Sequence, residues 1–456
     1  KEVETYTVWS LTMPCPCFLL EQTRKRAIRL TLSGCFEPVT LSAPDCDCNP
    51  MFPVCIDCRG TKGLCGISPC PLLEQVRKKI PQTEQAPLTE LAGPSPPSLF
   101  VGRFDYPHVR AGPSASWIRE SGQAGISSGD PAELFGRPLE EVASRHSNLV
   151  TGGSTMPISS PNSPDSILET TQLIAMSSSF VDVEMDFNRP VVVGGRPSFD
   201  SMSTPLGASG EVVRAEVVGH ARVPRKVDAI SGETDLLANE AMAELTESGI
   251  GEAQVSRMLS SGILGREGKR RLVPTRWGIT ATDDIVSKQR WERVRHLPSI
   301  DKFMVFYSSY LDNRFHVILT PGLWAFHMME AWSQGSVWSG SEEVMEDWED
   351  IEPKSEYASS ITGAYYSARL AVLEHLENIG RSGACLVWRD IGPGYWAPVG
   401  VWLIREAMRD AMKSNPRVFD SLEEAIRHVS GRVSSPPSLR NSRFAKRGRQ
   451  MSLHSF

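Results

Sequence analysis

The 456 residues contain no run of 18 apolar side chains, which excludes a hydrophobic membrane-spanning helix, and no membrane partner is expected. The chain also lacks a Walker A sequence, a G-x-G-x-x-G loop after a predicted strand and an H-E-x-x-H sequence, so an ATP-driven motor is disfavoured. An excess of positive charge is missing as well, because the formal net charge is −6. Contact with nucleic acid must therefore come from a local basic patch rather than from the whole surface.

Cysteine is nearly absent from most of the chain: nine of the ten cysteines lie within the first 70 residues, and only Cys385 follows. A secreted disulfide framework would spread its cysteines through the folded domains, so the clustering favours one metal site in a reducing cytoplasm. Residues 1–50 show no steady helical or strand period, whereas the organised cysteines follow directly after Met51. We therefore expect residues 1–50 to be a leader upstream of the natural start.

Four of these cysteines, Cys55, Cys58, Cys65 and Cys70, have the compact spacing C-x2-C-x6-C-x4-C, with glycines in the loops between them. Four thiolates form a closed tetrahedral site, which is how structural zinc is held. A four-cysteine iron–sulfur cluster is the alternative. Catalytic zinc is not expected, because no ligand position is left open for water. The spacing predicts a zinc knuckle with Zn2+ in a structural role.

The last seven residues read Q-x-x-L-x-x-F. One helical turn would place Leu453 and Phe456 on the same side as a small apolar plug, with the Gln450 amide one turn earlier. Such a peptide suits a preformed groove on another protein. The pattern resembles the motif by which replication and repair proteins attach to the DNA sliding clamp (PCNA). That motif usually ends in two aromatic residues, and this chain has one.

Together with the cysteine cluster and the tail, two further segments resemble the archaeal Nre family of DNA repair proteins. They are Leu99–Pro113 (LFVGRFDYPHVRAGP) and Arg271–Thr280 (RLVPTRWGIT). The resemblance extends over about residues 51–456. It implies a cytoplasmic archaeal protein that takes part in the response to DNA damage and binds the sliding clamp through its tail. It does not imply a particular molecular activity.

Helical and strand patterns alternate without a regular βαβ rhythm, so the sequence predicts an α+β fold of mixed helices and antiparallel strands. The expected organisation is a leader at 1–50, a zinc knuckle at 51–80, a proline-rich linker at 81–97, an N-terminal Nre-like domain at 98–295, a C-terminal Nre-like domain at 296–430 and a disordered tail at 431–456.

Several elements have a clear period. Residues 303–310 and 315–320 predict an antiparallel hairpin, and residues 357–379 predict a long helix. Another helix is expected at 282–295, with Asp283 and Asp284 at its positive N-terminal end. Residues 342–356 contain eight acidic side chains, which we interpret as a solvated acidic loop.

The densest basic cluster outside the tail consists of Lys269, Arg270, Arg271 and Arg276, followed by Trp277. Lysine and arginine neutralise phosphates, and an indole ring stacks on an exposed base, so these five residues are the candidates for nucleic-acid binding. The alternative is a solvated turn with Trp277 in the core.

The leading hypothesis is a DNA repair factor recruited to the sliding clamp, with DNA as a further partner. The alternative is an enzyme that acts on nucleic acid or a nucleotide and is recruited by the same tail. Its site would lie where Arg103, Arg110, Arg276 and the helix at 357–374 converge, and no catalytic residue is assigned. A scaffold without DNA contact is the third hypothesis. A deep pocket with arginines and a perturbed carboxylate would favour the enzyme.

Overall fold

The computed structural model describes residues 55–58, 64–67, 70–80, 84–118, 129–195, 197–199, 203–333, 336, 338 and 344–446. The chain divides into two compact units, Lys1–Met51 and Phe52–Phe456, and all described residues belong to the second unit. The expected leader and the motif at 450–456 lie outside the described residues.

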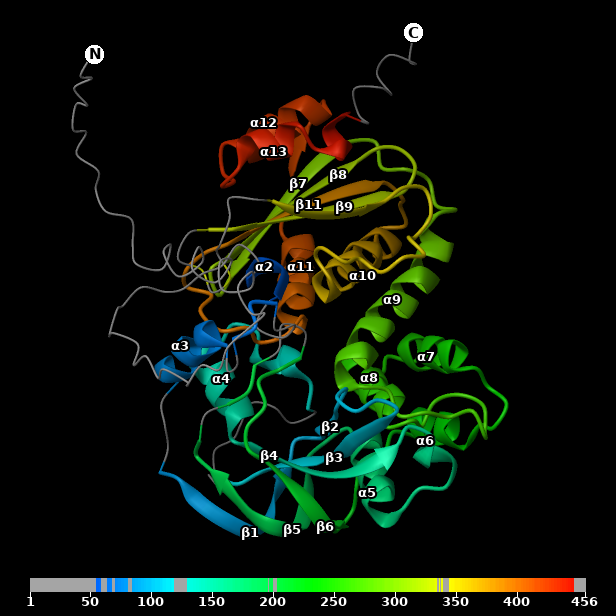
Figure 1. Cartoon of the computed structure of the whole chain (residues 1–456). Coiled ribbons are helices and arrows are strands. Elements are labelled where there is room, and N and C mark those ends of the chain that lie inside the picture. Colours follow the sequence, from blue (N-terminus) through cyan, green and yellow to red (C-terminus); the bar gives the residue numbers. More distant parts are fainter. Residues whose placement is uncertain are drawn as a thin grey trace, which may run out of the picture. The chain divides into compact units, whose positions relative to one another are not determined.

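The first sheet has six strands in the order β1-β5-β6-β4-β3-β2 (Figure 1). They are β1 (Ala86–Ser95), β2 (Leu99–Val101), β3 (His108–Ser116), β4 (Leu149–Pro157), β5 (Val181–Val193) and β6 (Ser209–Val218). Neighbours run antiparallel except β4 and β6, which are parallel. Alternate residues of β5, such as Val183 and Met185, are buried in a core shared with α5 (Ser166–Met176), because a strand presents every second side chain to one face.

Helices lie between strands of the first sheet and, from α6 to α9, between the two sheets in the chain. They are α4 (Leu139–Ser147), α6 (Arg225–Gly232), α7 (Ala238–Glu247), α8 (Glu252–Ser260) and α9 (Thr275–Val294), with short 3-10 helices at Pro131–Leu134 and Ser160–Asn162. Helices α8 and α9 pack closely at Gly278, where an added Cβ would lie 2.4 Å from the Ser260 hydroxyl. The close approach of these two helices brings the side chains of a pocket together.

The second sheet has the order β10-β9-β11-β8-β7-β12. Its strands are β7 (Phe303–Tyr310), β8 (Asn313–Thr320), β9 (Ala325–Trp332), β10 (Met345–Glu349), β11 (Ala384–Ile391) and β12 (Arg417–Phe419). Figure 1 shows α10 (Gly363–Asn378) and α11 (Trp402–Lys413) on one face, and α12 (Leu422–Ser430) and α13 (Pro436–Arg440) on the other. Strands β9 and β11 are buried at every position, because helices cover both faces.

The α+β prediction is confirmed, with mixed sheets and helices. The predicted hairpin is formed by β7 and β8, and the long helix is α10. The predicted start of the helix at 282 is wrong, because α9 begins at Thr275 directly after Pro274. Thr275–Thr282 contains threonines and a glycine, which are weak helix formers, so packing against α8 stabilises this part of α9. Asp283 and Asp284 consequently lie inside the helix rather than at its N-terminus.

Two predictions about irregular segments are also wrong. Residues 86–95 of the expected linker form β1, which pairs with β5 and buries Leu91 in the core of the first sheet despite two prolines and a glycine in the segment 86–95. Residues 431–446 of the expected disordered tail are ordered and contain α13. Their apolar side chains Leu439, Phe444 and Ala445 are buried in the core beside α12, which offsets the low order that the Ser, Pro and Arg composition suggests.

Candidate functional site

An exposed aromatic cluster lies where the turn between β2 and β3 meets the start of α9. Phe104, Tyr106 and Trp277 are 76%, 50% and 45% exposed, and we call these three residues the aromatic cluster. The ring centroids of Tyr106 and Trp277 are 5.3 Å apart, and the Arg103 guanidinium lies 5.0 Å from the centroid of the Phe104 ring. Exposed aromatic rings beside arginine are typical of surfaces on which unpaired bases stack.

Hydrogen bonds fix the turn that carries Phe104 and Tyr106. The Gly102 amide donates to the Arg110 carbonyl at 2.8 Å, and the Val101 amide donates to the Thr275 hydroxyl at 2.9 Å. The second bond ties β2 to the first residue of α9, two positions before Trp277. The aromatic cluster therefore stands on a defined backbone frame.

The five predicted nucleic-acid residues differ in what they are able to do. Trp277 is exposed and belongs to the aromatic cluster, so its alternative placement in the core is wrong. Lys269 and Arg271 are exposed, and Arg276 is half-buried. Arg270 has a structural role, because its guanidinium donates to the carbonyls of Gly265, Ser231 and Glu233 at 3.0, 3.1 and 2.6 Å.

A pocket of about 120 Å³ lies between α8, α9, α11 and the segment before β2. Leu99, Ile279 and Trp402 contribute apolar walls, while Arg257 and Arg405 contribute charged ones. The residues expected to converge at an enzyme site do not form this pocket. Its described lining includes no residue of α10 and none of Arg103, Arg110 and Arg276.

Ion pairs fix the charged wall of the pocket. Arg405 Nη2 lies 2.8 Å from Asp283 Oδ1, and Arg409 Nη2 lies 2.9 Å from Glu252 Oε1. Burial lowers the pKa of Arg405, but Asp283 and Glu252 outweigh burial and hold that pKa above its ordinary value. Burial raises the pKa of Glu252, and the cations Arg409 and Arg405 reverse this, so the pKa of Glu252 is lowered. Both side chains are therefore charged at neutral pH.

Arg257 has a different environment. Its Nη1 donates to the Gly129 carbonyl at 3.2 Å. Burial lowers the pKa of Arg257 to about 10, which nearby Asp130 and Glu133 offset only in part. The neighbouring imidazole of His146 has its pKa lowered by burial to about 4, so that ring is neutral at pH 7.

These pocket residues were missed because the signal in the sequence is weak. Helix α8 buries Gln254, Ser256 and Ser260, which are polar residues at positions where a helix packed in a core has apolar ones. Polar side chains on the buried face of a helix indicate a polar partner, and that pattern was the available clue.

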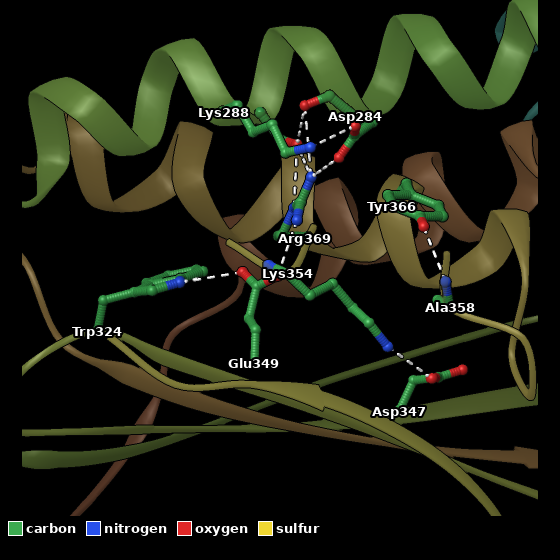
Figure 2. A network of polar contacts seen from close by, with 10 residues as sticks. Asp284, Lys288, Trp324, Asp347, Glu349, Lys354, Ala358, Tyr366 and Arg369 are labelled. Atoms are coloured by element: carbon green, nitrogen blue, oxygen red, sulfur yellow. Dashed lines mark hydrogen bonds and ion pairs between the residues drawn. The ribbon is translucent and has the colours of Figure 1, made fainter. Parts of the chain in front are cut away.

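The acidic segment at 342–356 is not a solvated loop throughout, because its residues 345–349 form β10. The Glu349 carboxylate accepts from Arg369 at 2.8 Å and from the Trp324 indole at 3.0 Å (Figure 2). Asp347 accepts from the Lys354 ammonium at 2.9 Å. Burial lowers the pKa of Arg369, but Glu349 and Asp284 outweigh burial and raise it above its ordinary value. Asp347 and Glu349 therefore belong to a buried network in which Arg369 joins α9, α10 and β10, whereas Asp350, Glu352 and Glu356 are exposed.

The four cysteines lie in different settings. Cys55 and Cys58 are the two ends of the short helix α2 (Cys55–Cys58) and are buried, whereas Cys65 and Cys70 are half-buried, the last directly before α3 (Pro71–Lys79). Within the described ranges, no three His, Cys, Asp or Glu side chains are grouped so that they hold a metal ion. Residues 59–63 and 68–69, which connect the cysteines, lie outside those ranges. The zinc knuckle stays a prediction.

The comparisons with known proteins agree on one family. A family model described as "Archaeal Nre, N-terminal" matches residues 64–339, and one described as "Archaeal Nre, C-terminal" matches residues 349–456. The chain is 35% identical over 407 residues to DNA repair protein NreB of Archaeoglobus fulgidus, which covers 88% of this chain and 99% of that protein.

Two further relatives are both called DNA repair protein NreA. The one from Archaeoglobus fulgidus is 35% identical over 384 residues, with 84% of this chain and 94% of that protein covered. The one from Haloferax volcanii is 32% identical over 363 residues, with 78% and 86% covered. No solved structure matches the chain. In the part that the structure describes, no helix combines the length and the apolar character that a membrane crossing requires.

Proposed function

This chain belongs to the archaeal Nre family, and we propose that it is a DNA repair factor that acts in the response to DNA damage in the cytoplasm. Three relatives named as DNA repair proteins, each covered over 86% or more of its length, support the proposal. The structural observation that carries it is the aromatic cluster, which offers stacking surfaces on a chain whose net charge is −6.

The aromatic cluster suits DNA that is unpaired or distorted. A base has to leave its duplex partner before its face is accessible to Tyr106 or Trp277. Arg103 beside Phe104 then lies close to the sugar–phosphate backbone, and the exposed Lys269 and Arg271 add positive charge nearby in the sequence. Such a surface binds DNA through stacking with little dependence on base sequence.

The Trp277→Ala variant is expected to bind single-stranded DNA about 5- to 150-fold more weakly than the parent, because one stacked base contributes about 1–3 kcal/mol. Fluorescence anisotropy with a labelled oligonucleotide at two salt concentrations measures the affinity. Tyr307→Ala is the matched control, because Tyr307 is an aromatic residue of similar exposure, 47%, on the second sheet. Equal losses in both variants would mean that the aromatic cluster has no special part in DNA binding.

We further propose that the C-terminal peptide recruits the protein to the sliding clamp. Gln450, Leu453 and Phe456 lie outside the described residues, so the support is the spacing of the sequence alone. A tail of this kind raises the local concentration of the body at sites where the clamp is loaded on DNA.

Calorimetric titration of the clamp from the same organism tests this recruitment. Replacing Leu453 and Phe456 by alanine is expected to weaken clamp binding about 30-fold or more, because a central anchor residue contributes about 2 kcal/mol or more. His454→Ala is the control, since His454 lies between the anchors and is not part of the motif. Unchanged binding by the double variant would place the contact elsewhere.

A structural zinc ion bound by Cys55, Cys58, Cys65 and Cys70 is also proposed, on the chemistry of four clustered thiols. Elemental analysis of the purified protein distinguishes zinc from iron, and a protein free of both metals would remove the proposal.

The second candidate function is an enzyme acting on nucleic acid or a nucleotide, recruited by the same tail. The observation that favours it is the pocket, which is lined by the half-buried Arg257, the buried Arg405 and Glu252, a carboxylate whose pKa is lowered. Conversion of a nucleic-acid substrate by the purified protein would support this candidate. DNA binding through the aromatic cluster, without conversion of the DNA, would support the leading candidate, a DNA repair factor that is not an enzyme.

A further inference from the structure

We propose that the pocket between α8, α9 and α11 takes up a single nucleobase of the DNA that the aromatic cluster holds. The inference rests on the proposed DNA contact and adds to it a second site with a defined ligand class. The pocket is enclosed by segments that are far apart in sequence, among them Leu99, Arg257 and Trp402.

The size of the pocket fits one aromatic ring system. Its volume is about 120 Å³. An engineered apolar cavity of about 150 Å³ binds one benzene molecule, so this pocket has room for a planar ring and none for a whole dinucleotide. A nucleobase is the planar part of DNA that matches such a space.

The walls provide both of the contacts that a base needs. Leu99, Leu149, Ile279 and Trp402 are apolar or aromatic and suit the two faces of a planar ring. Ser260 supplies a polar group at the edge: it is 1% exposed, and its hydroxyl has no hydrogen-bond partner among the described residues. A buried hydroxyl without a partner is costly, and an atom on the edge of a base would satisfy it.

Arg257 adds a preference for acceptor groups. Its guanidinium lines the pocket and donates to the Gly129 carbonyl at 3.2 Å. The carbonyl oxygens and ring nitrogens of a base accept hydrogen bonds from guanidinium groups, whereas a fully apolar ligand has no acceptor for them. The polar wall therefore favours a nucleobase over a plain hydrocarbon ring.

The pocket and the aromatic cluster flank the same helix end. Thr275, Ile279 and Thr282 line the pocket and follow one face of α9, because residues at i, i+4 and i+7 lie together on a helix. Trp277 lies on the other side of that first turn and packs on Tyr106. A strand stacked on the cluster would cross the start of α9 and present its next unstacked base to the pocket.

Filling the pocket tests the inference. Ala253 lines the pocket and is half-buried on α8, so Ala253→Leu fills the space while Ala253→Ser leaves it open. Ile279→Phe fills it from α9, and Ile279→Val is the matching control. The second pair keeps the test valid if the first filled variant has a lowered melting temperature. The probe is a single-stranded oligonucleotide with one 2-aminopurine, a base analogue whose emission changes when its stacking changes.

With the parent protein and both control variants, we expect the 2-aminopurine emission to change on binding. With the filled variants this change should be lost, and the affinity for the oligonucleotide should fall about tenfold, the amount that one bound base contributes. Anisotropy, measured in parallel, reports DNA binding independently of base uptake.

Two outcomes would overturn the inference and are distinguishable from failure of the proposed function. DNA binding with the same emission change in filled and parent proteins would leave the DNA contact intact and remove the pocket as a base site. No DNA binding, together with quenching of tryptophan emission by free nucleosides, would remove the DNA contact and make a free nucleoside the ligand. The double loss, with neither DNA nor nucleosides bound, would remove both proposals.

Discussion

The Arg369→Met variant is expected to lose about 3–5 kcal/mol of unfolding free energy, because methionine leaves the Glu349 carboxylate buried without its cation. The side chains of both residues are 0% exposed. Arg369 Nε also donates to the Ser287 hydroxyl at 3.0 Å, so the substitution removes a link between α10 and α9 as well as the link to β10. Urea unfolding followed by circular dichroism measures the loss.

Arg427→Met is the matched control. Arg427 pairs with Glu423 at 3.0 Å on the surface of α12, where the two side chains are 66% and 83% exposed. Exposed pairs contribute about 0–1 kcal/mol, because water screens both charges. If the two variants unfold at the same urea concentration, the Arg369 network does not hold the helices to β10.

The Arg369 network also shows where prediction from the sequence reaches its limit. The period of residues 357–379 predicts a long helix and places Arg369 on it, but the period does not identify Glu349 and Asp284 as partners. Eight acidic residues between positions 342 and 356 indicate a solvated loop, because carboxylates are normally hydrated unless a cation pairs with them. Lys354 pairs with Asp347, and Arg369 pairs with Glu349. These pairs form only because β10 lies against α10 in the folded protein, which the sequence does not show.

In the candidate site, too, local sequence indicates some residues, whereas others are brought together only by tertiary packing. The sequence names Trp277 as a candidate through its basic neighbours, and the start of α9 directly after Pro274 leaves that indole exposed. The pocket was not found, because Leu99, Arg257 and Trp402 meet only through tertiary packing of β2, α8 and α11. Arg270 was overinterpreted as a DNA contact, because the sequence does not show that three carbonyls occupy its guanidinium.

The Phe444→Ala variant is expected to lose about 3–5 kcal/mol of unfolding free energy, because it removes a large side chain from a packed core. Phe444 is 5% exposed in the cluster that contains Val429, Leu439 and Ala445. Thermal and urea unfolding measure the change. Arg443→Ala is the neighbouring control: that side chain is 55% exposed and contacts the Trp348 ring at 4.2 Å, so about 1 kcal/mol or less is expected.

The same result decides how the proposed clamp-binding peptide is attached to the body. If the core anchors the chain as far as Lys446, the four residues to Gln450 span at most about 14 Å, and a bound clamp would be held close to the second sheet. A disordered tail from residue 431 would allow a much longer reach and a lower effective concentration of the body on DNA. Unfolding of Phe444→Ala at the parent's urea concentration would favour the long tether. A large loss of stability, in a variant that retains Leu453 and Phe456 and the proposed clamp binding, would establish the short tether.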